Sequence, residues 1–203
     1  MMIDETPPRA PNSMKMLTAA TIVLAALILA SSAGAASSAN RARSDEVVKG
    51  AEANILAAGK SDPVDTPKVN QAIDELRQAL KIDPRNDSAY VDLGFCYGLL
   101  RDGSTAEDMY RTATMINPSP ANYKELADVY LRMGNFESAL MAANAGLQKD
   151  PRDAKLYNAK GMALHDLMRT DEAEQAFRRA LAYDPSFEVA RRNLEALTSK
   201  KSP

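Results

Sequence analysis

The sequence predicts an all-α protein, a helical-repeat solenoid built from antiparallel helix pairs. Of its 203 residues 45% are hydrophobic, and Ala and Leu dominate that set, which favours helices over strands. Four acid-or-amide–proline pairs recur, with their prolines 34, 33 and 34 residues apart. They are Asp83-Pro84, Asn117-Pro118, Asp150-Pro151 and Asp184-Pro185. A constant period of this length is typical of stacked repeats of two helices.

Composition excludes several classes of function. A formal net charge of −2 and a pI of about 5.6 give no strong attraction to nucleic acid, so no nucleic-acid partner is expected. The single cysteine, Cys96, excludes an internal disulfide framework and a multi-cysteine metal site. The single histidine, His165, leaves little for metal binding or acid–base chemistry. We therefore expect no metal, no cofactor and no enzymatic activity.

The first 35 residues are predicted to be a signal peptide or an N-terminal membrane anchor. Residues 16–30 carry no charge, Lys15 precedes them, and Ala33-Gly34-Ala35 supplies a small-x-small cleavage site. The preceding stretch, MMIDETPPRAPNS, is long and partly acidic for a leader, an oddity that disappears if translation begins at Met14 rather than Met1. A cleaved leader predicts an exported protein, periplasmic or secreted. The alternative is a single-pass anchor retained through residues 16–36.

A linker over residues 36–44 and a worn helix pair are expected next. The first helix, about 45–59, has only one apolar stripe, formed by Val48, Ala51, Ile55 and Ala58. The second helix is predicted over 67–82, with Thr66 as its N-terminal cap. The bend between them, KSDPVDT, is longer than the later bends.

Three full helix pairs follow, each closed by one of the prolines, because proline cannot continue a helix. Their apolar residues recur at helical spacing and small residues stand where helices would cross. Ser104 to Glu107 resembles a capping box, and Ser119-Pro120 places a cap before a proline at the first helical position. A last helix over 187–199, with Leu194 and Leu197 inward, would cap the stack.

The recurring columns resemble the tetratricopeptide repeat family. The first copy has Tyr90, Leu93-Gly94, Tyr97, Ala106, Tyr110, Ala113 and Pro118. The second has Tyr123, Leu126-Ala127, Tyr130, Ala139, Gly146 and Pro151, and the third has Tyr157, Gly161, Leu164, Ala173, Phe177, Ala180 and Pro185. The resemblance covers 45–199, leaving a tail over 200–203. It implies a right-handed solenoid with three full units, one degenerate N-terminal unit and one C-terminal capping helix.

The resemblance also implies a groove whose wall is made by the first helix of each pair. Carried over by position, the wall would hold Val91, Phe95, Leu99, Lys124, Asp128, Leu131, Arg132, Asn158, Met162, His165 and Arg192. Members of the family that bind chaperone tails clamp a terminal carboxylate with asparagine and basic residues. Here Phe95, Asp128 and Met162 stand where such a clamp would want asparagine or another polar residue, so that client is not expected.

Two functions follow as hypotheses. The first is a non-catalytic interaction module or scaffold of the cell envelope that binds a peptide or helix of a partner protein in the groove. The alternative is a structural protein of the same compartment that self-associates into a homo-oligomer through the helix near 45–59.

Overall fold

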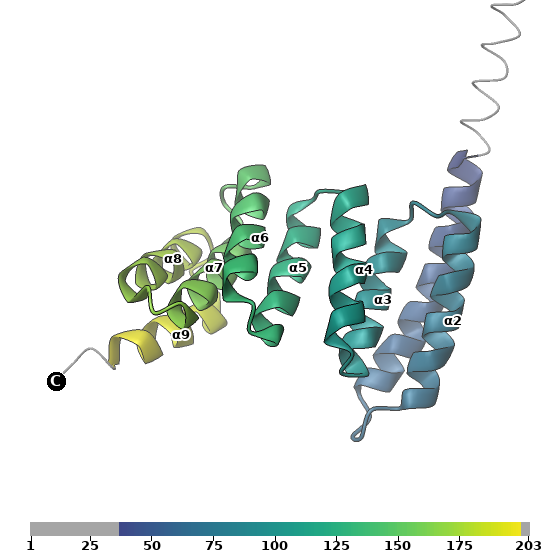
Figure 1. Ribbon diagram of the computed structural model, residues 1–203, viewed down its shortest axis with the longest axis horizontal. Helices are drawn as coiled ribbons and strands as arrows, with labels where there is room; N and C mark the ends of the chain where they lie inside the picture. Colours follow the sequence, from purple (N-terminus) through teal and green to yellow (C-terminus); the bar gives the residue numbers. More distant parts are fainter. Residues whose placement is uncertain (1–36, 200–203) are drawn as a thin grey trace, which may run out of the picture. The chain divides into compact units, whose positions relative to one another are not determined.

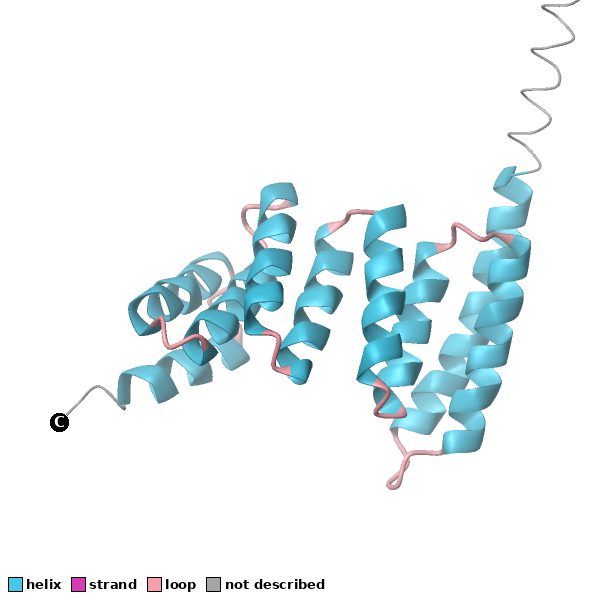
Figure 2. Ribbon diagram, viewed as in Figure 1, coloured by secondary structure: helices cyan, strands magenta, loops and turns pink. Residues whose placement is uncertain are grey.

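The computed structural model describes residues 37–199, which contain nine helices and no strands (Figure 2). A helix over 37–59 comes first. It is followed by α2 (Thr66–Ile82), α3 (Asp87–Leu99), α4 (Gly103–Ile116), α5 (Pro120–Met133), α6 (Phe136–Lys149), α7 (Ala154–Asp166), α8 (Thr170–Tyr183) and α9 (Glu188–Ser199). The chain divides between Ala42 and Arg43 into two units, and of the first the structure describes only residues 37–42, which are helical. The second unit holds the stack of helix pairs.

The first helix begins earlier than the sequence predicted, because residues 37–44, expected to be a linker, are helical. Within the second unit, Ser44 is fully buried and its hydroxyl donates to the Ala79 carbonyl oxygen at 2.9 Å. The amide of the buried Asn86 donates to Ser44 Oγ and to Asp45 Oδ1, both at 2.8 Å. These polar contacts hold the helix at Ser44 and Asp45 against the end of α2 and the start of α3.

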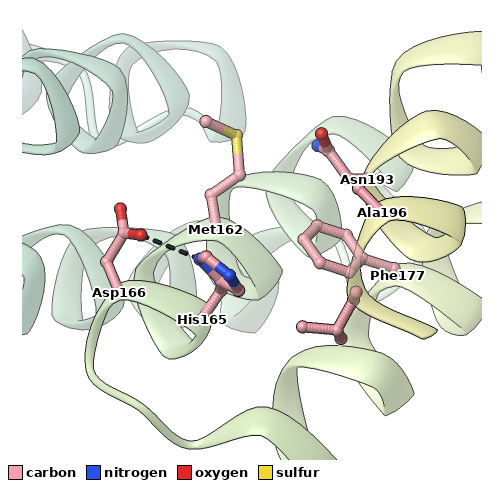
Figure 3. A pocket seen from close by; sticks show the side chains of 7 residues that line it. Met162, His165, Asp166, Phe177, Asn193 and Ala196 are labelled. Atoms are coloured by element: carbon pink, nitrogen blue, oxygen red, sulfur yellow. Dashed lines mark hydrogen bonds and ion pairs between the residues drawn. The ribbon is translucent and has the colours of Figure 1, made fainter. Parts of the chain in front are cut away.

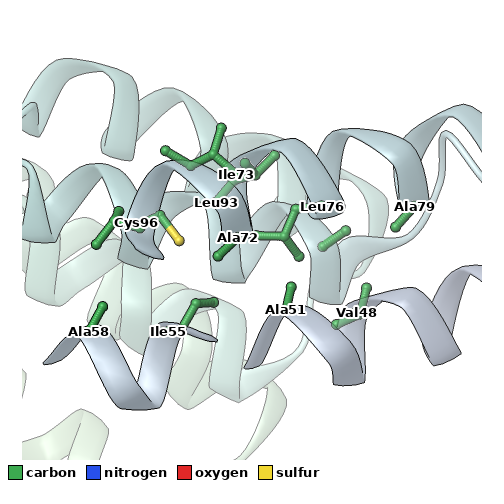
Figure 4. Close-up of a cluster of buried hydrophobic side chains, with 12 residues drawn as sticks. Val48, Ala51, Ile55, Ala58, Ala72, Ile73, Leu76, Ala79, Leu93 and Cys96 are labelled. Carbon is green, nitrogen blue, oxygen red and sulfur yellow. The ribbon is translucent and has the colours of Figure 1, made fainter. Parts of the chain in front are cut away.

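The apolar stripe predicted for the first helix is confirmed. Val48, Ala51, Ile55 and Ala58 are buried and point toward the side chains of α2 (Figure 4). Leu93 and Cys96 of α3 complete this cluster (Figure 4). Burial of each large apolar side chain contributes about 1.5–3 kcal/mol, so the worn first pair is anchored to the stack by an ordinary hydrophobic core.

Two predicted helix starts are corrected. Asp65, not Thr66, caps α2, because its carboxylate accepts from the backbone N–H of Lys68 at 3.2 Å. Asp102 caps α4 through the N–H of Thr105 at 3.1 Å, and the expected cap Ser104 donates its hydroxyl to Asp102. In both cases an aspartate slightly earlier in the chain takes the position. The prediction for Ser119 is confirmed, since its hydroxyl accepts from the N–H of Asn122 at 3.2 Å.

The acid-or-amide–proline pairs end the second helices, as predicted. The backbone N–H of each residue before proline donates at 2.9 Å to the carbonyl of a small residue four positions earlier. These bonds join Asp83 to Ala79, Asn117 to Ala113, Asp150 to Gly146 and Asp184 to Ala180. The two repeating columns therefore belong to one structural feature, the last turn of each second helix.

Close helix crossings explain the glycines of the repeat. A Cβ added to Gly146 would lie 2.7 Å from Leu156 Cδ1, and one added to Gly161 would lie 2.5 Å from Phe177 Cε1. Real Cβ atoms do not approach other atoms so closely, so a methyl group at either position would force the facing side chain or helix to shift.

The helix pairs stack in chain order through the second unit (Figure 1). Between pairs, α3 contacts α5, α5 contacts α7 and α7 contacts α9, while α4, α6 and α8 contact only neighbouring first helices among α2 to α9. The first helices are thus the more closely spaced series. We call the surface formed by residues 43–59, α3, α5, α7 and α9 the first-helix face.

Candidate partner-binding face

All the residues predicted for the groove wall lie on first helices. Val91, Phe95 and Leu99 lie on α3; Lys124, Asp128, Leu131 and Arg132 on α5; Asn158, Met162 and His165 on α7; and Arg192 on α9. Their surroundings differ from helix to helix. The structure sorts them into an apolar N-terminal end, a charged middle and a polar C-terminal end.

Among the apolar candidates, only Phe95 and Met162 are strongly exposed. Val91 and Leu131 are partly buried against the cluster that contains Tyr110 and Val129. Leu99 is partly buried against the N-terminal cluster of Figure 4. Phe95 leaves 48% of its surface uncovered. Packing therefore occupies Val91, Leu99 and Leu131 in part, and Phe95 is the large apolar side chain of α3 that remains open to a ligand.

The middle of the face carries a compact charged group on α5. The Lys124 ammonium lies 2.9 Å from Glu125 Oε1 and 3.0 Å from Asp128 Oδ2. Burial alone would lower the pKa of Lys124, but the contacts with Glu125 and Asp128 outweigh it and the pKa is raised. Arg132, one turn further along, is exposed. These charges largely neutralise one another, so this part of the face has little net attraction for a charged ligand.

A small pocket of about 200 Å³ lies at the C-terminal end, where α7, α8 and α9 meet (Figure 3). Met162, His165 and Asp166 line one side, and Asn193 and Leu197 are contributed by α9. His165 Nδ1 lies 2.8 Å from Asp166 Oδ1, the contact marked in Figure 3. Next to the pocket, the buried Asn158 accepts from the Asn193 amide at 2.9 Å, and Arg192 is exposed on α9. The polar side chains that line the pocket, His165, Asp166 and Asn193, are thus paired within the chain.

A larger pocket of about 470 Å³ lies at the N-terminal end, between the first helix and α3. It is lined by Glu52, Ile55, Leu56, Gly59, Lys60, Asp92 and Phe95. Leu56 is 60% exposed, and Asp92 Oδ2 is buried with no hydrogen-bond partner among residues 37–199. Burial, and secondarily the charge of Glu52, raise the pKa of Asp92 to about 7.

Of these pocket residues, sequence reasoning found only Phe95 as a ligand contact. Leu56 follows Ile55 and lies off the buried stripe, which is the one signal that could have marked it as an uncovered apolar residue. Nothing in the sequence distinguishes Glu52 and Asp92 from the other acidic residues. Only the packing of the first helix against α3 brings these two carboxyl groups to the same pocket.

The single cysteine lies within the hydrophobic core. The thiol of Cys96 is buried, and burial followed by the charge of Asp92 raises its pKa to about 12. It is therefore protonated and unreactive at neutral pH, as the prediction of a small buried hydrophobe requires. Within residues 37–199, no group of three or more His, Cys, Asp or Glu side chains is arranged to hold a metal ion. In the same range no helix is long and apolar enough to cross a membrane, and the segment 16–36 lies outside it.

Two tetratricopeptide repeat family models match the chain, one over residues 68–127 and the other over 124–187. Together they span more than half of it. The chain belongs to the tetratricopeptide repeat (TPR) family. Among curated proteins, this TPR protein is 32% identical over 97 residues to the small glutamine-rich tetratricopeptide repeat-containing protein 2 of Mycosarcoma maydis. That match covers 47% of this chain but only 28% of the relative, so the chain spans about a quarter of that protein's length.

Solved TPR structures share the fold. The chain is similar to pilF of Pseudomonas aeruginosa with a TM-score of 0.66 and 17% identity, over 78% of this chain and 70% of that one. It is also similar to the first TPR domain of Spaghetti (RPAP3), solved bound to the HSP90 peptide SRMEEVD. There the TM-score is 0.55 and the identity 21%, over 60% of this chain and 97% of that one. Stacked helix pairs of this family suggest a role in protein–protein interaction.

Proposed function

We propose that this TPR protein is a non-catalytic interaction module or scaffold of the cell envelope. It binds a peptide or helix of a partner protein along its first-helix face. The observation that carries the proposal is the pair of uncovered apolar side chains, Leu56 and Phe95, beside a pocket on that face. Large uncovered apolar side chains beside a cavity are typical of a binding surface. The peptide in the RPAP3 structure supports the choice of a peptide or helix as ligand.

The proposed compartment follows from the N-terminal segment. Residues 16–30 are uncharged and a small-x-small site follows at Ala33-Gly34-Ala35. Such a segment supports export to the periplasm or exterior, with retention as a single-pass anchor as the alternative. Mass spectrometry of the mature N-terminus from the native host distinguishes the two. A chain beginning near Ala36 supports cleavage, and a chain retaining Met1 or Met14 contradicts it.

The binding face is tested by co-purification from envelope fractions of the native host. A variant with Phe95→Ala, Lys124→Ala and Met162→Ala should stay folded and lose the partner that the unaltered chain retains. A hot-spot aromatic such as Phe95 contributes about 2 kcal/mol of binding, roughly a thirtyfold change in affinity.

The matched control places similar changes on second helices. Met115→Ala, Met141→Ala and Lys149→Ala remove two exposed methionines and an exposed lysine from α4 and α6. This control should retain the partner. Retention of every partner by the first variant contradicts the assignment of binding to the first-helix face.

Self-association is the alternative, motivated by the exposure of Leu56 on the predicted contact helix 45–59. Sedimentation of the purified full chain tests it. A monomer at high concentration removes this function, and a dimer that Leu56→Ala dissociates would replace the leading proposal.

A further inference from the structure

The walls of the N-terminal pocket are mainly apolar. Ile55 and Leu56 form one wall and Phe95 forms the other, with Gly59 leaving room at the end of the helix. The volume of about 470 Å³ falls within the range of pockets that enclose specific ligands. Because Leu56 and Phe95 are both about half uncovered or more, a long aliphatic or aromatic group could bury substantial apolar surface there.

The pocket also contains an incomplete polar contact. Asp92 Oδ2 is shielded from water and accepts no hydrogen bond from the described residues. Almost all buried polar atoms in proteins are paired, and leaving one unpaired costs about 1–3 kcal/mol. Rotation of the carboxyl about its broad χ2 torsion would present either oxygen to the pocket that Asp92 lines. Because the rotation exchanges the two oxygens, a donor supplied by a ligand would pair the oxygen that faces the pocket and would offset part of the cost of burying the carboxyl.

The surroundings of Asp92 favour a positively charged donor. From the first helix and the turn after it, Glu52 and Lys60 line the same pocket, so two carboxylates face one ammonium group. Burial raises the pKa of Cys96 on α3 and of Tyr110 on α4, and the nearby Asp92 charge raises both pKa values further. Both side chains are therefore neutral near pH 7. The first helix ends at residue 59, beside the pocket, and a helix C-terminus attracts cations.

We propose that this pocket receives an arginine or lysine side chain from an apolar segment of the partner. The stem of that side chain packs between Leu56 and Phe95, and its charged end donates to Asp92 and Glu52. This inference rests on the proposed function, because it names the chemistry of the segment that the first-helix face binds. An arginine on the face of Phe95 would add a cation–π contact.

Other ligands fit less well. An acidic segment could pair with Lys60 but would bring a third carboxylate toward Glu52 and Asp92. A purely apolar segment would cover Leu56 and Phe95 but would bury the Asp92 carboxyl more deeply without supplying a donor. A basic side chain with an apolar stem meets both requirements of the pocket.

The test uses the full chain and an array of 12-residue peptides in matched triplets. The three peptides of a triplet share leucine and phenylalanine positions and differ at one central residue, which is arginine, norleucine or glutamate. The strongest arginine peptide is then titrated by fluorescence anisotropy against the unaltered protein, Asp92→Asn, Glu52→Gln and the control Asp74→Asn. Asp74 is an exposed carboxylate on α2. Circular dichroism verifies that each variant is folded.

We expect the arginine peptide to bind roughly tenfold or more tightly than its norleucine twin, since a charge-assisted contact in a partly buried site is strong. Asp92→Asn should abolish that preference, Glu52→Gln should reduce it, and Asp74→Asn should leave it unchanged. For the unaltered protein the preference should be larger at pH 8 than at pH 6, because the pKa of Asp92 is about 7 and only its ionised form attracts the cation.

Two results would overturn the inference in distinguishable ways. Equal binding of the arginine and norleucine twins, or an unchanged preference in Asp92→Asn, would remove the cationic ligand and leave the proposed function standing. Absence of binding by every peptide, together with retention of all partners by the Phe95, Lys124 and Met162 variant, would remove both.

Discussion

The two ends of the first-helix face differ in how completely their polar side chains are hydrogen-bonded and their apolar side chains are buried within the chain. At the C-terminal end, α9 supplies Asn193 and Leu197, and the polar side chains of the pocket pair within the chain, His165 with Asp166 and Asn193 with Asn158. At the N-terminal end, Asp92 Oδ2 has no hydrogen-bond partner in the described part of the chain, and about half or more of Leu56 and Phe95 is exposed. The same repeat therefore produces a C-terminal end packed by the chain's own last helix and an N-terminal end whose apolar and polar groups could still contact a bound segment.

The largest expected effect separates two phenylalanines on these two ends. Phe177→Ala should lower the free energy of unfolding by about 3–4 kcal/mol, because the ring is buried under the C-terminal pocket and its removal leaves a cavity. Phe95→Ala should cost less than about 1 kcal/mol, because much of that ring is already in water. Urea unfolding of the full chain measures both. Equal losses would contradict the division into a packed end and an open end.

A smaller effect is expected from two glycines. Gly161→Ala should destabilise by about 2 kcal/mol, since the added methyl group would press on the Phe177 ring and force α7 and α8 apart. Gly50→Ala should stabilise by about 0.5–1 kcal/mol, because no atom of the described residues lies within 4 Å of the new Cβ and alanine favours the helix. Thermal unfolding followed by circular dichroism compares the two. A stabilising Gly161→Ala would refute the close crossing of α7 and α8.

The smallest effect concerns two carboxylates and depends on pH. The pKa of Asp92 is raised to about 7 in the folded chain from 3.8, so its protonated form is favoured by folding. The protonated Asp92 carboxyl is compatible with burial, so the folded chain is most stable with respect to this group below about pH 3.8. That stability is lost as pH rises through 7 and the buried carboxyl ionises. Asp92→Asn removes this loss and should stabilise by about 1.5 kcal/mol more at pH 8 than at pH 5, after allowance for residual solvent exposure.

Asp166→Asn is the matched change at the other end. Asp166 is exposed and pairs with His165, so its replacement should cost less than about 1 kcal/mol. Urea midpoints at the two pH values measure both variants. If Asp92→Asn destabilised the chain at pH 8, the carboxylate would have a partner in solution and the N-terminal end would not be open.

Much of the fold could be predicted because the repeat records contacts that recur in every unit. The residues before the prolines and the small residues four positions earlier form one hydrogen-bonded turn. Two of the repeating positions in the sequence therefore indicate the same structural feature, the end of each second helix. The early start of the first helix could not be predicted in the same way. The hydrogen bonds of Ser44 and Asp45 with Asn86, close to that start, join distant parts of the chain and leave no periodic apolar pattern in the sequence.

The site could be predicted only as a face. Position in the repeat identified the helices and found Phe95, Met162 and His165, which line pockets in the structure. It could not tell that Val91 and Leu131 would be partly covered by neighbouring side chains. Nor could it find Asp92, because the isolation of one carboxylate oxygen depends on how closely the first helix approaches α3.

The central claim is that a partner segment docks at the N-terminal end of the first-helix face. The most direct measurement is a titration of the ¹⁵N-labelled full chain with the strongest arginine peptide of the array, followed by amide chemical shifts. We predict that the amide chemical shifts of residues 52–60 and 92–96 change and that those of residues 162–166 and 193–197 do not. Shifts centred on α7 and α9 instead would contradict this prediction.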